Sequence, residues 1–186
     1  TVLIIILVVA GFLSVRHFYF QPREVKAQAA MYKGEIYFAK DSFELALKGN
    51  GADFVGFEAI ADDYSSTKAG NLAAAYAGIC YYNLGKDAEA LAYLKKFDGD
   101  DAFLSPNIEA MIGNCYANMD QYDDAIKAFE KAAKKADNEM ASPIFLQKAA
   151  TVAEKMGNYK KALDFYQKIK DEYSQSMIGR DIDKYI

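Results

Sequence analysis

The stretch GICYYNLG at residues 78–85 returns in altered form as GNCYANMD at residues 113–120. Each copy has a small residue, an aromatic residue three positions later, and an alanine nine positions after that. The members of the two copies are Gly78, Tyr81 and Ala90, then Gly113, Tyr116 and Ala125. The same spacing recurs in Gly34, Tyr37 and Ala46, and, without the aromatic residue, in Ala150, Ala153 and Ala162. Ala90, Ala125 and Ala162 are separated by 35 and 37 residues, which is close to the period of a two-helix repeat.

The physical role of each repeated residue type supports this interpretation. A glycine or alanine on the first helix of a pair lets the second helix approach closely, and the following aromatic residue fills the adjacent groove. The later alanine is the matching contact point on the second helix. We therefore expect a large side chain at Ala90 or Ala125 to force the helices apart, at a cost of about 1–3 kcal/mol.

The chain from Pro22 onward reads as all-helical, because apolar segments are separated by short runs of glycine, asparagine and aspartate without strand-like alternation. Two dipeptides, Ser105-Pro106 and Ser142-Pro143, are predicted to begin helices. Serine accepts hydrogen bonds from free first-turn amides, and proline needs no amide partner at the first helical position.

The repeated glycine, aromatic and alanine positions resemble the tetratricopeptide repeat, and the resemblance covers about residues 27–173. The resemblance implies an all-α fold in which stacked helical hairpins form a solenoid. The first unit departs from the pattern through KGNGADFVGFEAIADDYSSTKAGN at residues 48–71, which we expect to interrupt a helix at 49–51 and to resume it at 54–64. The alternative is an ordinary helical bundle with accidental similarity.

The first twenty residues predict a transmembrane helix. Residues 2–15 carry no charge, and with residues 16–20 they would rise about 28 Å as a helix, near the thickness of a bilayer core. Arg16, His17 and Tyr19 are then expected at the membrane interface. A signal peptide and a buried helix are alternatives, although no small-x-small cleavage site follows. The orientation of the anchor cannot be read from these residues.

We therefore expect a transmembrane anchor at 1–21, a juxtamembrane helix and first repeat-like unit at 22–52, and a resumed helix and linker at 53–70. Residues 71–186 are expected to hold the remaining repeats and the start of a terminal helix.

The composition offers no sign of catalytic or nucleic-acid chemistry. The 22 basic and 26 acidic residues are mixed along the chain, which argues against nucleic acid as a partner. The single histidine, His17, has no nucleophile or metal-ligand partner in a recognisable motif. KGNG at 48–51 lacks the spacing of a phosphate-binding loop. Cys80 and Cys115 are predicted to be two separate, buried thiols. We expect a non-enzymatic protein without a cofactor or metal.

By resemblance to tetratricopeptide proteins, the partner-binding groove is lined by exposed positions of each first helix. These positions are Ala75, Ile79, Tyr82, Asn83, Ala110, Asn114, Ala117, Asn118, Gln147, Thr151, Glu154 and Lys155. Asn83, Asn114 and Asn118 are the preferred ligand-facing residues, because an amide can both donate to and accept from a peptide backbone. For Asn83 and Asn118, a turn-forming role near a helix end is an equal alternative. Chaperone-type carboxylate clamps use lysine and asparagine where this chain has Ala75 and Ile79, so we expect no such clamp.

The whole chain, including STKAGNLA at 66–73 and YAGICYYNLG at 76–85, resembles the YfgM-type ancillary subunits of the bacterial Sec translocon, in forms associated with Bacteroidetes. This resemblance implies a single-pass protein of the inner membrane with its C-terminal repeat domain in the periplasm. The implied partners are translocon subunits, a periplasmic prolyl-isomerase-like chaperone and exported client proteins.

Two other functions stay open. YSSTKAGNLA and YSQSMIGRDI are similar to helix starts in repeat proteins of outer-membrane assembly, although such proteins usually carry a lipidated cysteine that we do not find here. A structural subunit of another cell-envelope or secretion complex is the second possibility.

Overall fold

The computed structural model describes residues 2–186, with side chains from residue 4 onward, and forms two compact units. The first is Thr1–Leu84 and the second is Gly85–Ile186. Residues 2–186 are helical with connecting turns and contain no β-strand, which confirms the predicted all-α class. The two units are described separately below.

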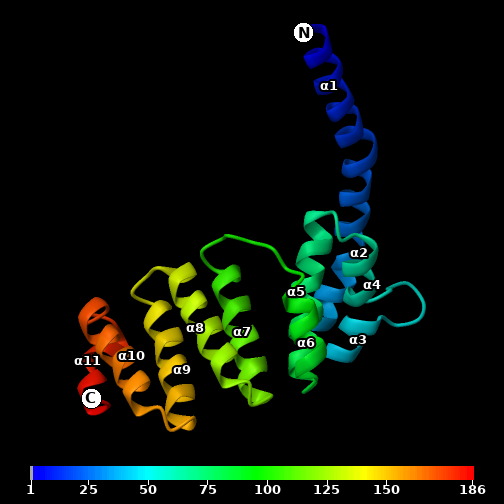
Figure 1. Cartoon of the computed structure of the whole chain (residues 1–186). Coiled ribbons are helices and arrows are strands. Elements are labelled where there is room, and N and C mark those ends of the chain that lie inside the picture. Colours follow the sequence, from blue (N-terminus) through cyan, green and yellow to red (C-terminus); the bar gives the residue numbers. More distant parts are fainter. Residues whose placement is uncertain (1) are drawn as a thin grey trace. The chain divides into compact units, whose positions relative to one another are not determined.

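The first unit begins with one long helix made of α1 (Val2–Val15), a π-helical segment η1 (Arg16–Phe20) and α2 (Gln21–Phe38), drawn in blue in Figure 1. The wider π turn directly precedes Pro22, which has no amide proton and whose ring would clash with a carbonyl one α-helical turn earlier. The stretch Ile4–Phe38 is long and apolar enough to cross a membrane. Its apolar side chains from Ile4 to Val15 are exposed in the isolated chain.

Three further helices pack around α2: α3 (Phe43–Lys48), α4 (Phe57–Asp63) and α5 (Lys68–Asn83). The expected interruption after residue 48 is present, and regular helix resumes at Phe57. Gly49 has φ of 85°, and an added Cβ there would lie 2.2 Å from the Phe54 carbonyl oxygen. Only glycine therefore allows the backbone at residue 49 to pass this close to the backbone at Phe54.

The second unit contains α6 (Asp87–Leu94), α7 (Leu104–Asn118), α8 (Tyr122–Ala136), α9 (Ser142–Lys155), α10 (Tyr159–Glu172), α11 (Met177–Arg180) and a 3₁₀ turn (Ile182–Lys184). Helices α7 to α10 lie side by side, each packed on the next (Figure 1). Their shared core includes Phe129, Leu146, Ala150 and Phe165. Short turns between consecutive helices produce the stacked hairpins that the repeat pattern predicted.

The close helix approach expected at the repeated glycine is confirmed in α7. A Cβ added to Gly113 would lie 2.8 Å from the ring of Phe129 on α8, so the missing side chain makes room for that ring. Ala125 is fully buried in the same core. The glycine and alanine therefore act as the small contact points that the sequence spacing indicated.

The predicted capping role of the two serines is wrong. At the start of α7, Asp101 accepts hydrogen bonds from the amides of Phe103 and Leu104 at 2.9 and 2.5 Å, and the Ser105 hydroxyl donates to Asp101 at 2.8 Å. Before α9, Asn138 Oδ1 accepts from the amides of residues 140 and 141 at 3.0 and 2.8 Å. Ser142 instead donates to the Ala133 carbonyl oxygen at 2.9 Å. An Asp or Asn four residues before Ser-Pro binds the turn that leads into the helix, because one side-chain oxygen can accept from several backbone amides at once.

Candidate protein-binding site

A cavity of about 320 Å³ lies in the second unit between α7 and α9, the first helices of two successive hairpins. Four of the residues predicted for the groove line it: Asn114, Ala117, Gln147 and Thr151. The other lining residues are Phe129, Ile144, Lys148 and Val152. The repeat register therefore identified half of the side chains around this cavity.

The cavity combines an apolar floor with polar groups at its edge. Phe129 and Val152 are buried, whereas Ile144 is 43% exposed. Lys148 Nζ donates to Asn114 Oδ1 at 3.2 Å and lies 5.7 Å from the centre of the Phe129 ring. No hydrogen bond within the described part of the chain engages Asn114 Nδ2. An apolar contact surface beside a free amide donor suits a protein segment with an exposed backbone carbonyl.

Several of the predicted groove residues are held by hydrogen bonds or ring contacts within the second unit. Asn118 Nδ2 donates to Asp87 Oδ1 at 3.0 Å, which ties α7 to α6. Glu154 accepts a hydrogen bond from the Tyr166 hydroxyl at 3.0 Å, and Lys155 lies 4.8 Å above the Tyr122 ring. The Thr151 hydroxyl donates to its own helix, at the Gln147 carbonyl oxygen. These contacts place Glu154 against α10 and Lys155 beside the start of α8, rather than around the cavity.

Two predicted positions are not exposed as we expected. Ala75 on α5 is 1% exposed and Ala110 on α7 is 5% exposed. A methyl group stays close to the helix backbone, so longer neighbouring side chains cover it, and Ala110 belongs to the core of the second unit. In the first unit, Ile79 and Tyr82 are half-buried, and Asn83 Nδ2 donates to the Ile79 carbonyl oxygen at 2.8 Å. That bond fits the helix-end alternative for Asn83.

The prediction missed Ile144 and Lys148, which lie on the same face of α9 as Gln147 and Thr151. These four residues follow the i, i+3, i+4, i+7 pattern of one helix face. Matching single positions to the repeat overlooked them, whereas tracing the whole face of α9 would have identified them.

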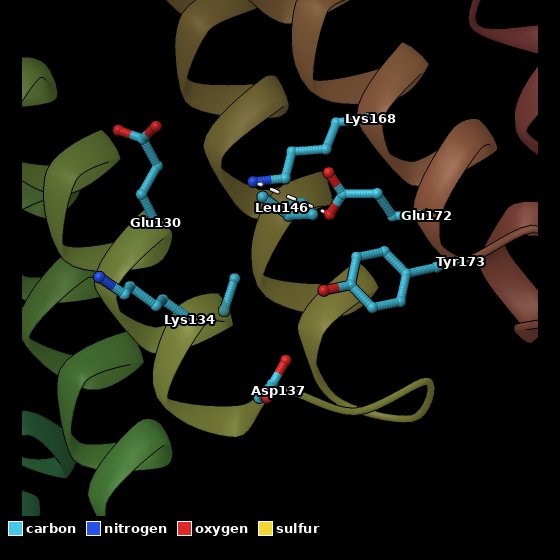
Figure 2. A pocket seen from close by; sticks show the side chains of 8 residues that line it. Glu130, Lys134, Asp137, Leu146, Lys168, Glu172 and Tyr173 are labelled. Atoms are coloured by element: carbon cyan, nitrogen blue, oxygen red, sulfur yellow. Dashed lines mark ion pairs between the residues drawn. The ribbon is translucent and has the colours of Figure 1, made fainter.

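A second hollow of about 480 Å³ lies beside α8 and α10 and has a different character. Figure 2 shows Glu130 and Lys134 on one side and Lys168, Glu172 and Tyr173 on the other, with Leu146 between them. Lys168 and Glu172 form an exposed ion pair at 4.0 Å. The charges of three carboxylates and two ammonium groups in this lining largely offset one another. We therefore interpret the hollow as part of the solvated outer surface.

The backbone amides that follow KGNG at residues 48–51 are engaged in hydrogen bonds. The amides of Ala52, Asp53 and Phe54 all donate to Asn50 Oδ1 at 3.1 Å, so they are not free to hold a phosphate. Lys48 ends α3 and residues 49–51 form a loop, as interpreted. No group of three or more metal-ligating side chains occurs among residues 4–186.

Both cysteines are free and buried, which confirms that part of the prediction. Burial raises the pKa of Cys80 and of Cys115 to about 12, and Asp87 contributes to the second shift. A thiol with so high a pKa is almost entirely protonated at neutral pH and is a poor nucleophile.

The residues predicted for the membrane interface all lie on η1 and are exposed. Tyr19 packs against Arg23, whose guanidinium carbon is 5.4 Å from the Tyr19 ring centre and 5.5 Å from that of Tyr64. Arg23 also donates to the Asp63 carbonyl oxygen at 2.5 Å. No local pattern indicates this contact, because Arg23 and Asp63 lie 40 residues apart.

Comparison with protein families finds tetratricopeptide repeats in three segments of the chain. Residues 110–139 match one tetratricopeptide-repeat model, and residues 76–98 and 146–176 match another. The segments at 110–139 and 146–176 include most of the helices that form the α7–α9 cavity. Tetratricopeptide repeats imply protein partners in general. No curated protein matches the chain.

Proposed function

We propose that this protein is a non-enzymatic tetratricopeptide scaffold, anchored in a membrane by residues 1–21, that binds a protein segment in the cavity between α7 and α9. The observation that carries the proposal is the composition of this cavity. It presents buried Phe129 and the free Nδ2 donors of Asn114 within a matched repeat, with exposed Ile144 beside them. Such a surface gives an amphipathic segment apolar contact and one directional hydrogen bond.

The proposal extends to the place of the protein in the cell. We infer a single-pass protein of the inner membrane whose C-terminal repeats lie in the periplasm. Its partners would be the Sec translocon and a periplasmic prolyl-isomerase-like chaperone, and its clients newly exported proteins. The support is the span-length apolar helix before the repeats and the resemblance of the whole chain to YfgM-type proteins.

The cavity can be tested by photocrosslinking from Thr151, which lines it and is exposed. Asn114→Ala should weaken crosslinking to clients, because loss of one hydrogen bond of about 1 kcal/mol lowers affinity roughly fivefold. Thermal stability should change little, since the only side-chain hydrogen bond of Asn114 among the described residues is an exposed one with Lys148.

Gln167→Ala provides the matched control for this test. Gln167 is also an exposed helical amide, hydrogen-bonded to Asp171 at 2.9 Å, but it lies on α10 outside the cavity. Its replacement should leave crosslinking unchanged. Equal yields from Asn114→Ala and the wild type would count against the cavity as the client site.

The membrane partners are tested by purifying the full-length chain from native membranes in mild detergent and identifying stoichiometric partners by mass spectrometry. Recovery of translocon subunits with a periplasmic chaperone would support the export role. Recovery of a different envelope complex would overturn it while leaving the scaffold intact.

An alternative function is a structural subunit of another cell-envelope complex, such as outer-membrane assembly or secretion machinery. The observation in its favour is a pair of similar helix starts. Thr67 accepts from Gly70 N at 2.9 Å, and Ser176 accepts from Gly179 N at 2.9 Å, each three residues after a tyrosine. Constant stoichiometry with one large complex, independent of export load, would favour this alternative.

A further inference from the structure

A cavity of about 320 Å³ lies in the first unit where the apolar helix gives way to polar sequence. The long helix contributes Arg16, Phe20, Gln21, Glu24 and Gln28, and the turn before α5 contributes Ser66, Thr67 and Lys68. Residues 2–20 would rise about 28 Å as a helix, so Arg16 and Phe20 lie where a bilayer core ends. The cavity therefore sits at the depth of lipid headgroups.

The walls of this cavity are fixed by hydrogen bonds. Glu24 accepts from Lys68 N at 2.7 Å and from Ala69 N at 3.1 Å, so a residue of the long helix caps α5. The Thr67 hydroxyl donates to the Tyr64 carbonyl oxygen at 2.7 Å. A Cβ on Gly70 would lie 1.9 Å from that same oxygen, so this turn admits only glycine.

The cationic groups at this cavity have no partner among the residues that the structure describes. No hydrogen bond or ion pair among the described residues engages the side chains of Arg16, Lys68 or Ser66. Glu24 is the one carboxylate in the lining, and it already accepts from two backbone amides and from Gln28 Nε2 at 2.9 Å. Two free cations and a free hydroxyl therefore face a shared space beside an occupied carboxylate.

We propose that this cavity binds the phosphate group of an anionic bilayer phospholipid. Arg16 would hold the phosphate through its planar pair of N–H donors, Lys68 would add a second positive charge, and Ser66 a hydroxyl donor. Phe20, which is 41% exposed, would contact the acyl side of the lipid. The inference rests on the membrane anchoring in the proposed function and adds a defined lipid site.

The test uses the full-length chain reconstituted with equal amounts of phosphatidylglycerol and phosphatidylcholine, followed by native mass spectrometry of the lipids retained in detergent. The wild type should retain phosphatidylglycerol in preference. The double variant Arg16→Gln/Lys68→Gln should lose roughly tenfold of that preference, because two charge-assisted contacts disappear. Both side chains are exposed and unpaired, so folding should be preserved.

Lys26→Gln/Lys40→Gln is the control, with the same change of charge at two exposed residues outside this cavity. It should keep the lipid preference. Equal losses in both double variants would show diffuse charge attraction and overturn the site, as would a wild type without preference. Displacement of the lipid by millimolar inorganic phosphate would assign the cavity to free phosphate instead.

Flotation of the same liposomes separates the two proposals. A chain that fails to float with the liposomes would overturn the anchoring. A chain that floats but shows no preference for phosphatidylglycerol would overturn only the headgroup site.

Discussion

Both compact units have a glycine at the same position of the repeat, but different side chains surround it. In the second unit, Gly113 makes room for one aromatic ring, that of Phe129 on the next helix. In the first unit, a Cβ on Gly34 would lie 2.6 Å from the ring of Phe54 and 2.7 Å from that of Phe57. The glycine leaves a space beside its helix, and the chain segment that follows the helix determines which side chains occupy that space.

The interrupted helix of the first unit is compensated by polar contacts. The Lys48 ammonium is paired with Glu58 and donates to the Tyr81 hydroxyl at 3.1 Å, and Tyr81 donates to Glu58 at 2.7 Å. Hydrogen bonding to Glu58 and then to Tyr81 raises the pKa of Lys48. This group connects α3, α4 and α5 across the interruption. The equivalent Tyr116 of the second unit accepts a hydrogen bond from Lys95 at 2.6 Å.

The largest expected effect comes from removing the ring beside each glycine. Phe129→Ala should destabilise the second unit by about 3–5 kcal/mol, because Phe129 is 2% exposed and is the ring that fills the space at Gly113. Phe54→Ala should cost less in the first unit, since Phe57 still occupies the space at Gly34. Hydrogen exchange of the α7–α8 and α2–α4 amides measures the two effects, and equal protection losses would refute the shared-space explanation.

The next effect comes from filling the glycine space itself. Gly113→Ala should cost about 1–3 kcal/mol by crowding Phe129, and Gly34→Ala should cost a similar amount by crowding Phe54 and Phe57. Combining Gly113→Ala with Phe129→Leu should restore part of the stability, because the smaller side chain leaves room for the methyl group. Thermal unfolding of the single and double variants checks this, and strict additivity would mean that the two residues do not interact.

The repeat skeleton was predictable because its residues act over a short range. Gly113, Tyr116 and Ala125 have fixed offsets along two consecutive helices, so the packing of α7 on α8 follows from spacing alone. The start of regular helix at Phe57 rather than residue 54 was not predictable in this way. It depends on Asn50 binding three amides and on Gly56, with φ of 92°, crossing close to the Leu47 carbonyl oxygen.

The candidate site was predictable only in part for a related reason. Asn114, Ala117, Gln147 and Thr151 follow from repeat register, but burial of Ala110 depends on the tertiary packing of α7 against its neighbours. The hydrogen bond from Arg23 to Asp63 and the cap that Glu24 provides for α5 join residues that are 40 and 44 positions apart. No local pattern carries such contacts, which arise only when α2 packs on α4 and α5.

The smallest expected effect concerns how helices start in the two units. In the first unit the cap of α5 includes the hydroxyl of Thr67, which does not titrate, whereas in the second unit the charged Asp101 accepts hydrogen bonds at the start of α7. Burial by itself raises the pKa of Asp101, but hydrogen bonds from the Ser105 hydroxyl and from backbone amides outweigh it. Together they lower the pKa from 3.8 to about 2.

A folded-state pKa below the unfolded value means that ionised Asp101 stabilises the protein above about pH 4, and that this contribution disappears as the pH falls toward 2. Asp101→Asn keeps an acceptor oxygen but not the charge, so it should cost about 0.5 kcal/mol at pH 7 and nothing near pH 2. Asn138→Ala removes a neutral acceptor from the turn before α9 and should lower stability by about 1 kcal/mol equally at both pH values. Denaturant unfolding from pH 2 to 7 compares them, and a pH-independent cost of Asp101→Asn would show that the carboxylate charge does not stabilise the start of α7.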